Sequence, residues 1–251
     1  MQLVTLLAFS VAVLIGTWLG GTGKKFQLRN LPAIDALSEG VGRAAELGAP
    51  IHFNPGWYEL NSVEAPQTVA ALSILTKLAH EAAKSNVRII TTLIRPDSIP
   101  VIDDIMRTAY TSEGKPELYN PDDIRYLSGE QWAYIGGVAK IFEDERPAVN
   151  ICMGGFMAYS LLIMEMATRY GMFRIGGTAS WHQMPFFAAT AHYTLIGEEL
   201  YAAGAYVSED PYKIGSLFGQ DLNKLITVIL IIIGTILSAS GSSLFFNLLK
   251  W

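Results

Sequence analysis

Hydrophobic positions follow two different patterns along this chain of 251 residues. Two long apolar segments lie near the ends, at Leu3–Leu19 and Leu225–Leu249, and neither contains a charged residue. Between them, apolar residues at helical spacing alternate with short runs rich in β-branched residues. The pattern therefore divides the chain into an N-terminal segment (1–23), a central domain (24–222) and a C-terminal segment (223–251).

Each end segment is predicted to form a transmembrane helix. A helix rises ~1.5 Å per residue, so about 20 apolar residues cross a hydrocarbon core of ~30 Å. A cleaved signal peptide is the alternative for the first segment. Met1 and Gln2 supply no basic region, however, and no clear cleavage motif precedes Lys24. We therefore favour an uncleaved anchor, which makes the lipid bilayer the first predicted partner.

Basic residues beside the two segments predict the orientation. Five basic residues lie on the side of the central domain: Lys24, Lys25, Arg29, Lys213 and Lys224. One basic residue, Lys250, lies beyond the second segment. Because basic residues near membrane helices mark the cytoplasmic side, the central domain is expected in the cytoplasm. The prediction is a two-pass protein of the cell membrane with both termini outside.

Small residues recur at every fourth position of both end segments, as Ala12, Gly16 and Gly20 and as Gly234, Ser238 and Ser242. Such rows let two helix backbones approach closely, within one chain or between copies. The alternative is that small residues are simply common in membrane helices. Neither apolar run, 3–19 or 225–249, contains an Asp, Glu, Lys, Arg or His residue that an ion or proton pathway would use, so a transporter is not predicted.

The central domain alternates predicted helices and strands. Helices are predicted near residues 34–47, 68–85, 101–111, 131–142, 155–170, 196–206 and 211–217, and strands at 51–53, 87–94, 124–127, 148–152 and 172–175. Parallel strands need crossover connections, which are usually helical. The pattern predicts a Rossmann-like α/β domain of three layers, with a mostly parallel sheet of about five strands.

Composition excludes several classes of protein. The chain is 51% hydrophobic with a net charge of −5, which is too apolar for a disordered protein and too acidic for one that binds nucleic acid. Cys152 is the single cysteine, so no internal disulfide forms, and its apolar surroundings predict a packed side chain.

Candidate ligand-binding residues follow the predicted strands, because ligands of open parallel sheets bind beyond the carboxyl ends of strands. They are Asn54, Arg95, Gly154, Gly155, Gly176, Gly177 and Thr178. Glycine lets backbone N–H groups approach an anion, and Gly155 is expected to open a helix whose N-terminus favours a phosphate. We favour the alternative that these turns need glycine for geometry alone, since neither GxGxxG nor a P-loop is present.

No catalytic residue, metal site or cofactor is predicted. The four histidines, at positions 52, 80, 182 and 192, show no spacing typical of metal ligands. The GxSxG motif of a nucleophile elbow is absent from the sequence.

Four phrases carry a resemblance to a known family. They are VGRAAELGAPIHFNPG (41–56), PDDIRYLSGEQWAYIGGV (121–138), GFMAYSLLIMEMA (155–167) and QMPFFAATAHYTLIGEELYAAGAYVSEDP (183–211). Together they resemble an uncharacterised family of prokaryotic membrane proteins defined by a domain of unknown function. The resemblance implies membrane attachment and one Rossmann-like domain, and it carries no functional residues. It also suggests residues 196–200 as a working surface.

Three functions remain as hypotheses. The first is a membrane-anchored scaffold or accessory subunit without catalysis, which self-associates as a homo-oligomer or joins the subunits of a larger membrane complex. The alternative is a membrane-tethered sensor that binds a nucleotide or another small ligand at the glycine turns. An enzyme acting on a lipid ranks last, because no base or nucleophile is evident.

Overall fold

The computed structural model describes residues 2–22, 30–208 and 210–239. The chain divides into two compact units, one formed by residues 1–29 and 209–251 and the other by residues 30–208. The second unit is the α/β domain, and it ends before the predicted boundary at residue 222 because Pro211–Ala239 is one continuous helix.

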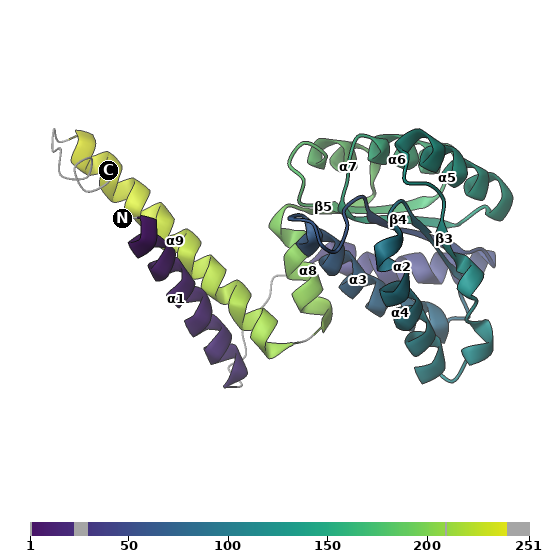
Figure 1. Cartoon of the computed structure of the whole chain (residues 1–251), viewed down its shortest axis with the longest axis horizontal. Helices are drawn as coiled ribbons and strands as arrows, with labels where there is room; N and C mark the ends of the chain where they lie inside the picture. The colour runs from purple at the N-terminus through teal and green to yellow at the C-terminus, as the bar shows by residue number, and fades with distance from the viewer. Residues whose placement is uncertain (1, 23–29, 209, 240–251) are drawn as a thin grey trace. The chain divides into compact units, whose positions relative to one another are not determined.

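The α/β domain contains a sheet of six parallel strands, which confirms the predicted fold class (Figure 1). The strands are β1 (Ile51–Gly56), β2 (Ile89–Leu93), β3 (Ile124–Tyr126), β4 (Val149–Gly155), β5 (Phe173–Thr178) and β6 (Tyr193–Ile196). Their order is β3-β2-β1-β4-β5-β6, the order of doubly wound dinucleotide-binding folds. Strand β6 was not predicted, and its last residue, Ile196, was instead placed at the start of the helix predicted at 196–206.

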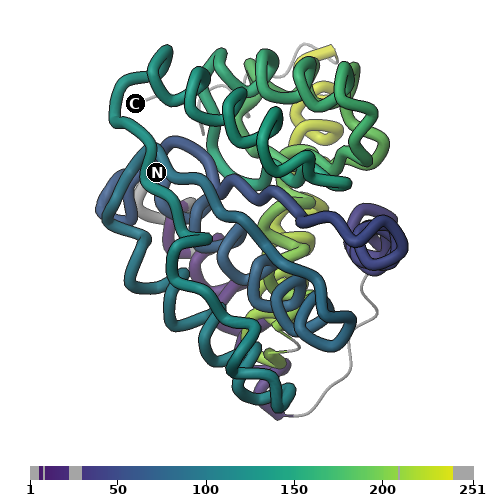
Figure 2. Tube along the Cα trace, turned by 90° about the vertical axis from the view of Figure 1, so that its right-hand side faces the viewer, coloured from purple at the N-terminus to yellow at the C-terminus, as the bar shows by residue number. Residues whose placement is uncertain are grey.

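Helices cover both faces of the sheet (Figure 1 and Figure 2). One face carries α2 (Pro32–Leu47), α3 (Ala65–Lys84), α4 (Ile99–Ser112) and α8 (Glu198–Ser208). The other carries α5 (Gln131–Glu145), α6 (Tyr159–Arg169) and α7 (Met184–Thr190). Short 3₁₀ turns at Pro96–Ser98, Pro116–Leu118 and Pro121–Asp123 complete the connections. The winding direction reverses between β1 and β4, which makes their carboxyl ends the topological switch point.

Each face of the sheet has its own apolar core, because successive strand residues point to opposite sides. Phe53, Ile151 and Ile175 pack with residues of α2 and α3. Cys152 packs with Tyr134 and Met164 under α5 and α6, as the apolar surroundings of this cysteine predicted. Gly48 ends α2 with a φ of 60°, the left-handed conformation in which glycine ends helices.

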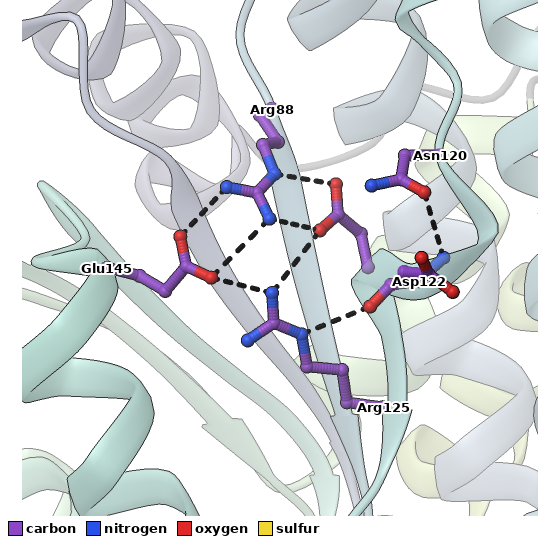
Figure 3. A network of polar contacts seen from close by, with 6 residues as sticks. Arg88, Asn120, Asp122, Arg125 and Glu145 are labelled. Atoms are coloured by element: carbon purple, nitrogen blue, oxygen red, sulfur yellow. Dashed lines mark hydrogen bonds and ion pairs between the residues drawn. The ribbon is translucent and has the colours of Figure 1, made fainter.

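An ion-pair network holds the short edge strand β3 to its neighbours (Figure 3). Arg88 donates to the buried carboxylate of Asp123 at 2.5 and 2.7 Å, and to Glu145 at the end of α5 at 2.8 Å. Arg125 of β3 donates to the same Glu145 at 2.6 Å. The hydrogen bond to Asp123 raises the pKa of Arg88, and that from Arg125 lowers the pKa of Glu145. The network compensates for a strand of only three residues.

The other unit pairs α1 (Gln2–Gly21) with α9 (Pro211–Ala239) in antiparallel directions (Figure 1). A Cβ atom added to Gly16 would lie 2.4 Å from the carbonyl oxygen of Gly215, and one added to Gly219 would lie 2.6 Å from the Cα of Val13. A side chain at either position would push the two helices apart. The glycines therefore set the distance between the two backbones.

The predicted rows of small residues have different surroundings in the structure. Ala12, Gly16 and Gly20 are buried, and the two glycines face Gly215, Gly219 and Pro211 of α9, a row that the sequence analysis missed. Gly234 is buried and Ser238 is exposed, while Ser242 lies outside the described residues. Gly215 and Gly219 show the same four-residue spacing, and this signal would have found them.

Among the described residues, one helix, α9, is long and apolar enough to cross a membrane. The apolar stretch Phe9–Gly21 in α1 is shorter than a membrane span, so a crossing by residues 3–19 stays a prediction. Residues 240–249 of the second predicted span lie outside the described part of the chain, as do Lys24, Lys25, Arg29 and Lys250, on which the predicted orientation depends.

Candidate functional site

The carboxyl ends of β1 and β4 meet at the switch point, where a ligand or a partner of this fold would bind. Gly56 pairs with Gly155, and the next N–H group, that of Trp57, donates to the Gly155 carbonyl oxygen at 2.7 Å. Gly154 has a φ of 134°, and a Cβ atom there would lie 2.1 Å from the Pro55 carbonyl oxygen. Only glycine fits this close contact between the two strands.

The prediction that Gly155 opens a helix is wrong. Gly155 is the last residue of β4, and α6 begins at Tyr159. The pairing of β1 with β4 is interrupted by a bulge at Gly154 and resumes where Gly56 pairs with Gly155, so β4 extends beyond the apolar run. Gly176 and Gly177 likewise lie within β5 rather than in a turn after it. The runs of apolar residues end before the glycines, which is why the sequence placed both strand ends too early.

Side chains of the protein itself occupy the space above these glycines. A Cβ atom on Gly155 would lie 2.3 Å from the ring of Tyr58. The corresponding contacts are 2.3 Å to the ring of Phe187 for Gly176 and 2.5 Å to Met153 Sδ for Gly177. All of these glycines are buried. Their surroundings agree with the interpretation that glycine is required here for packing.

The other predicted ligand-binding residues take part in local contacts. Asn54 is buried, and its Oδ1 accepts a hydrogen bond from the Gly56 N–H at 2.8 Å. Thr178 Oγ1 accepts from the Ser180 N–H at 3.1 Å. Arg95 stacks over the ring of Trp57 at 4.8 Å from the ring centroid, with its Nη1 3.7 Å from Glu59 Oε1. The structure thus brings Arg95 to the loop after β1, which the sequence pattern could not indicate.

Backbone N–H groups at this end of the domain already have acceptors on the chain. The Glu130 carboxylate accepts from the N–H groups of Trp132 and Ala133 at 2.8 and 2.9 Å, and Asp97 accepts from that of Leu60 at 2.5 Å. Gln67 accepts from the Ala179 N–H at 2.9 Å, and Glu199 accepts from the Ile196 N–H at 3.2 Å. An anion bound at a helix N-terminus needs such donors to be free. Three of these acceptors are carboxylates, which also repel a phosphate.

We call the loops after the strands and the first turns of the following helices the carboxyl-edge surface; it comprises residues 57–69, 94–102, 127–134, 156–162, 179–187 and 197–201. These segments contain six acidic residues and one basic residue, Arg95. The predicted working surface at residues 196–200 largely falls within it. Its charge does not suit nucleotides or other phosphates.

Exposed apolar side chains gather on the carboxyl-edge surface. Twelve large apolar side chains are exposed in residues 30–208, and eight of them lie on it: Val63, Val69, Val101, Trp132, Met157, Leu162, Trp181 and Tyr201. Trp132 is 68% exposed and Trp181 80% exposed. Leu47, Leu118 and Tyr170 lie toward the opposite edge, and Tyr126 ends β3. A concentration of this kind is typical of a protein-binding surface.

Beneath the surface lies a buried polar chain that the sequence analysis did not find. His52 Nδ1 lies 2.6 Å from Asn150 Oδ1, and His52 Nε2 lies 2.8 Å from Thr92 Oγ1. The Thr92 hydroxyl in turn lies 2.7 Å from the Tyr134 hydroxyl. Because Asn150 Oδ1 only accepts, His52 Nδ1 donates to it, and Thr92 donates to Nε2. The available signal was polar residues inside otherwise apolar strands.

Burial sets the protonation states of His52 and of Cys152, whose thiol lies beside Asn150 at one end of the buried polar chain. It lowers the pKa of His52 to about 4, so the imidazole is neutral at physiological pH. It also raises the pKa of Cys152 to about 12, so the thiol is protonated and unreactive. The hydrogen bonds join β1, β2 and β4 beneath α5, which indicates a role in holding the sheet. Within the described part of the chain, no group of three or more His, Cys, Asp and Glu residues is placed to hold a metal ion.

Comparison with known proteins supports one part of the resemblance, a family defined by a domain of unknown function. No curated protein and no solved structure matches the chain. A family model described as "Domain of unknown function (DUF6754)" matches residues 1–249, which is almost the whole chain and includes both units. The protein therefore belongs to the DUF6754 family, whose domain has no assigned function.

Proposed function

We propose that this protein is a membrane-anchored accessory or scaffold subunit that binds another protein through its carboxyl-edge surface. The observation that supports the proposal is the concentration of exposed apolar side chains there, eight of twelve in the α/β domain. Tryptophan, tyrosine and methionine are enriched in protein interfaces, and tryptophan above all in their energetic centres. Trp132 and Trp181 are the anchors we expect to matter most.

Charge indicates the chemistry of the partner. Six acidic residues against one basic residue give the carboxyl-edge surface a negative potential. Arg95, the one basic residue, already lies against Glu59 and Trp57. A partner surface with apolar residues surrounded by lysine and arginine complements this edge, and a small-ligand sensor receives less support because the glycines and backbone donors are occupied.

The membrane anchor in this proposal is α9, with its apolar run from Leu225 onward in the bilayer. The Asp221–Lys224 ion pair (2.9 Å) immediately before the run is suited to the membrane surface. We retain the second crossing by residues 3–19 and the cytoplasmic position of the domain as parts of the proposal. Asn223 Nδ2 donates to the Phe9 carbonyl oxygen at 3.0 Å, which sets the ion pair level with the middle of α1. With the pair at the membrane surface, the second crossing therefore requires α1 to shift along α9 from this register.

Site-specific photo-crosslinking in native membranes tests the docking surface. A photoreactive phenylalanine analogue replaces Trp132 or Trp181 in the full-length chain, and Leu47 or Tyr170 in two control variants. The controls are exposed apolar residues on the opposite edge, 72% and 49% exposed. We expect both tryptophan positions to give one discrete adduct with the same protein, and the controls to give none. Equal adducts from both edges, or none from either tryptophan position, would contradict the proposal.

A further inference from the structure

Glu64 lies directly before α3 and carries a charge that no lysine or arginine of residues 30–208 pairs with. Its carboxylate accepts a hydrogen bond from Gln67 Nε2, a neutral amide, at 2.7 Å. Four of the other five acidic side chains on the carboxyl-edge surface are engaged by an arginine or by backbone N–H groups of the chain itself: Glu59, Asp97, Glu130 and Glu199. Because Glu64 is also exposed, its charge is accessible to a molecule that binds from outside.

Two tyrosine side chains lie near the Glu64 carboxylate. Burial, and after it the negative charge of Glu64, raises the pKa of both Tyr58 and Tyr201, so both phenol groups lie within electrostatic range of this carboxylate. Tyr201 belongs to α8, which packs closely on α3: a Cβ atom added to Gly204 would lie 3.4 Å from the Cα of Ala70. A carboxylate beside aromatic rings is suited to a cation, because the faces of the rings are also electronegative.

The surroundings of Glu64 include exposed apolar side chains of the carboxyl-edge surface. Val63, the residue before it, is 95% exposed. Gln67, whose amide holds Glu64, is buried, and its Oε1 accepts a hydrogen bond from the Ala179 N–H at 2.9 Å. This contact ties the start of α3 to the loop that carries Trp181, which is 80% exposed. A protein that covers these apolar side chains therefore covers the carboxylate as well.

We propose that the partner protein places a basic side chain, arginine or lysine, against Glu64 when it binds the carboxyl-edge surface. This position of the cation rests on the proposed function, because it requires a docked partner. Docking excludes water from Glu64, and a buried carboxylate without a cation is strongly unfavourable. A basic side chain removes that penalty and also gains from the nearby rings of Tyr58 and Tyr201. Glu64 thereby discriminates against proteins that present an apolar or acidic group at this position.

Photo-crosslinking from position 181 measures the contribution of this charge. The photoreactive phenylalanine analogue replaces Trp181 in the full-length chain in native membranes, and a second substitution is either Glu64→Gln or the control Glu59→Gln. The control removes the same charge from the same surface, at a carboxylate that already faces Arg95 of the chain. We expect Glu64→Gln to lower the yield of the adduct about fivefold or more, and Glu59→Gln to lower it less than about twofold.

A charge series at position 64 separates electrostatics from any change in folding. Glu64→Cys is combined with the photoreactive residue at position 181 and reacts with a thiosulfonate reagent that carries either a sulfonate or a trimethylammonium group. The native Cys152 is buried and protected from the reagent. The two products are the same variant and differ in the sign of one charge. We expect the sulfonate form to give about fivefold or more adduct than the trimethylammonium form, with a smaller difference at high salt.

Three results would overturn the role of Glu64 and leave the docking proposal standing. The first is an undiminished adduct from Glu64→Gln, and the second is an equal yield from the sulfonate and trimethylammonium forms. The third is an equal loss from Glu64→Gln and Glu59→Gln, which would show a general attraction between charged surfaces. If the parent variants at Trp132 and Trp181 give no adduct, the docking proposal itself fails, and the position of the cation fails with it.

Discussion

Replacing Gly155 by alanine is expected to destabilise the α/β domain in the absence of any ligand. The added Cβ atom would lie 2.3 and 2.6 Å from two ring carbons of Tyr58, well inside van der Waals contact. Forcing extra atoms into a packed site costs about 1–3 kcal/mol. Gly155 does not have a positive φ, so steric contact with Tyr58 is the expected source of the loss.

Cys152 provides the assay, since it is the single thiol of the chain and is fully buried in this domain. A thiol reagent reaches it when the domain opens, so the labelling rate follows the opening equilibrium if closing is fast. A loss of about 1–3 kcal/mol corresponds to labelling that is about 5- to 150-fold faster. The full-length protein in a mild detergent is suitable, because the buried cysteine reports on the α/β domain alone.

Tyr58→Ala completes a double-mutant cycle that isolates the contact. With the ring removed, Gly155→Ala should cost at least 1 kcal/mol less than it does in the native background, because its main clash is gone. Additive effects in the cycle would refute the steric reasoning. So would a Gly155→Ala variant with native labelling that has lost binding of inorganic phosphate, because that result would assign the glycine to an anion.

Three other changes have defined outcomes. Acidification from pH 7 to pH 4.5 should destabilise the domain by about 2–3 kcal/mol through His52. The pKa of His52 is about 4 in the folded protein and 6.5 when unfolded, so the stabilisation from keeping this imidazole neutral is complete above pH 6.5 and is lost as pH falls toward 4. A stability profile that is flat between pH 7 and pH 4.5 would contradict this prediction. Glu145→Gln should lower the free energy of unfolding by about 1 kcal/mol, and by less at high salt, because it weakens the contacts to Arg88 and Arg125. Cys152 labelling at two ionic strengths measures both effects. A loss of stability that salt does not change would argue against an electrostatic origin. Gln220→Cys should react with a membrane-impermeant maleimide added to the domain side of the membrane, whereas Ile233→Cys should be protected. The reason is that α9 is expected to enter the bilayer between these two positions. Equal reactivity at both positions would contradict this placement of α9.

Elements that bury a periodic set of side chains are predictable from sequence, and elements without such a period are not. Long helices and buried central strands bury a periodic set of side chains, so α3 and α5 were found within a few residues of their observed starts. β6 is an edge strand of four residues that lies directly before α8, so the sequence did not separate it from the helix predicted at 196–206. The glycines at the ends of β4 and β5 interrupted the apolar runs, although backbone pairing resumes at Gly155 and includes Gly176 and Gly177.

The candidate site depended more strongly on tertiary structure. The position of the site at the carboxyl ends of the strands follows from the α/β alternation, and Asn54 and Arg95 do lie there. What fills the space is decided by side chains distant in sequence: Tyr58 over Gly155 and Phe187 over Gly176. No local pattern encodes such contacts.

The α/β class, the apolar character of the two ends and the acidic balance follow from the amino-acid sequence alone, because each depends on local periodicity or on composition. Four features depend on the three-dimensional structure: the strand order, the meeting of β1 with β4 at the switch point, the buried hydrogen-bonded chain from His52 to Tyr134, and the packing of α1 on Gly215 and Gly219. It also gathered eight exposed apolar side chains from separate loops onto one edge. Such features arise from pairing between segments far apart in the chain, and the free energy of that pairing depends on three-dimensional complementarity rather than on the residues of either segment alone.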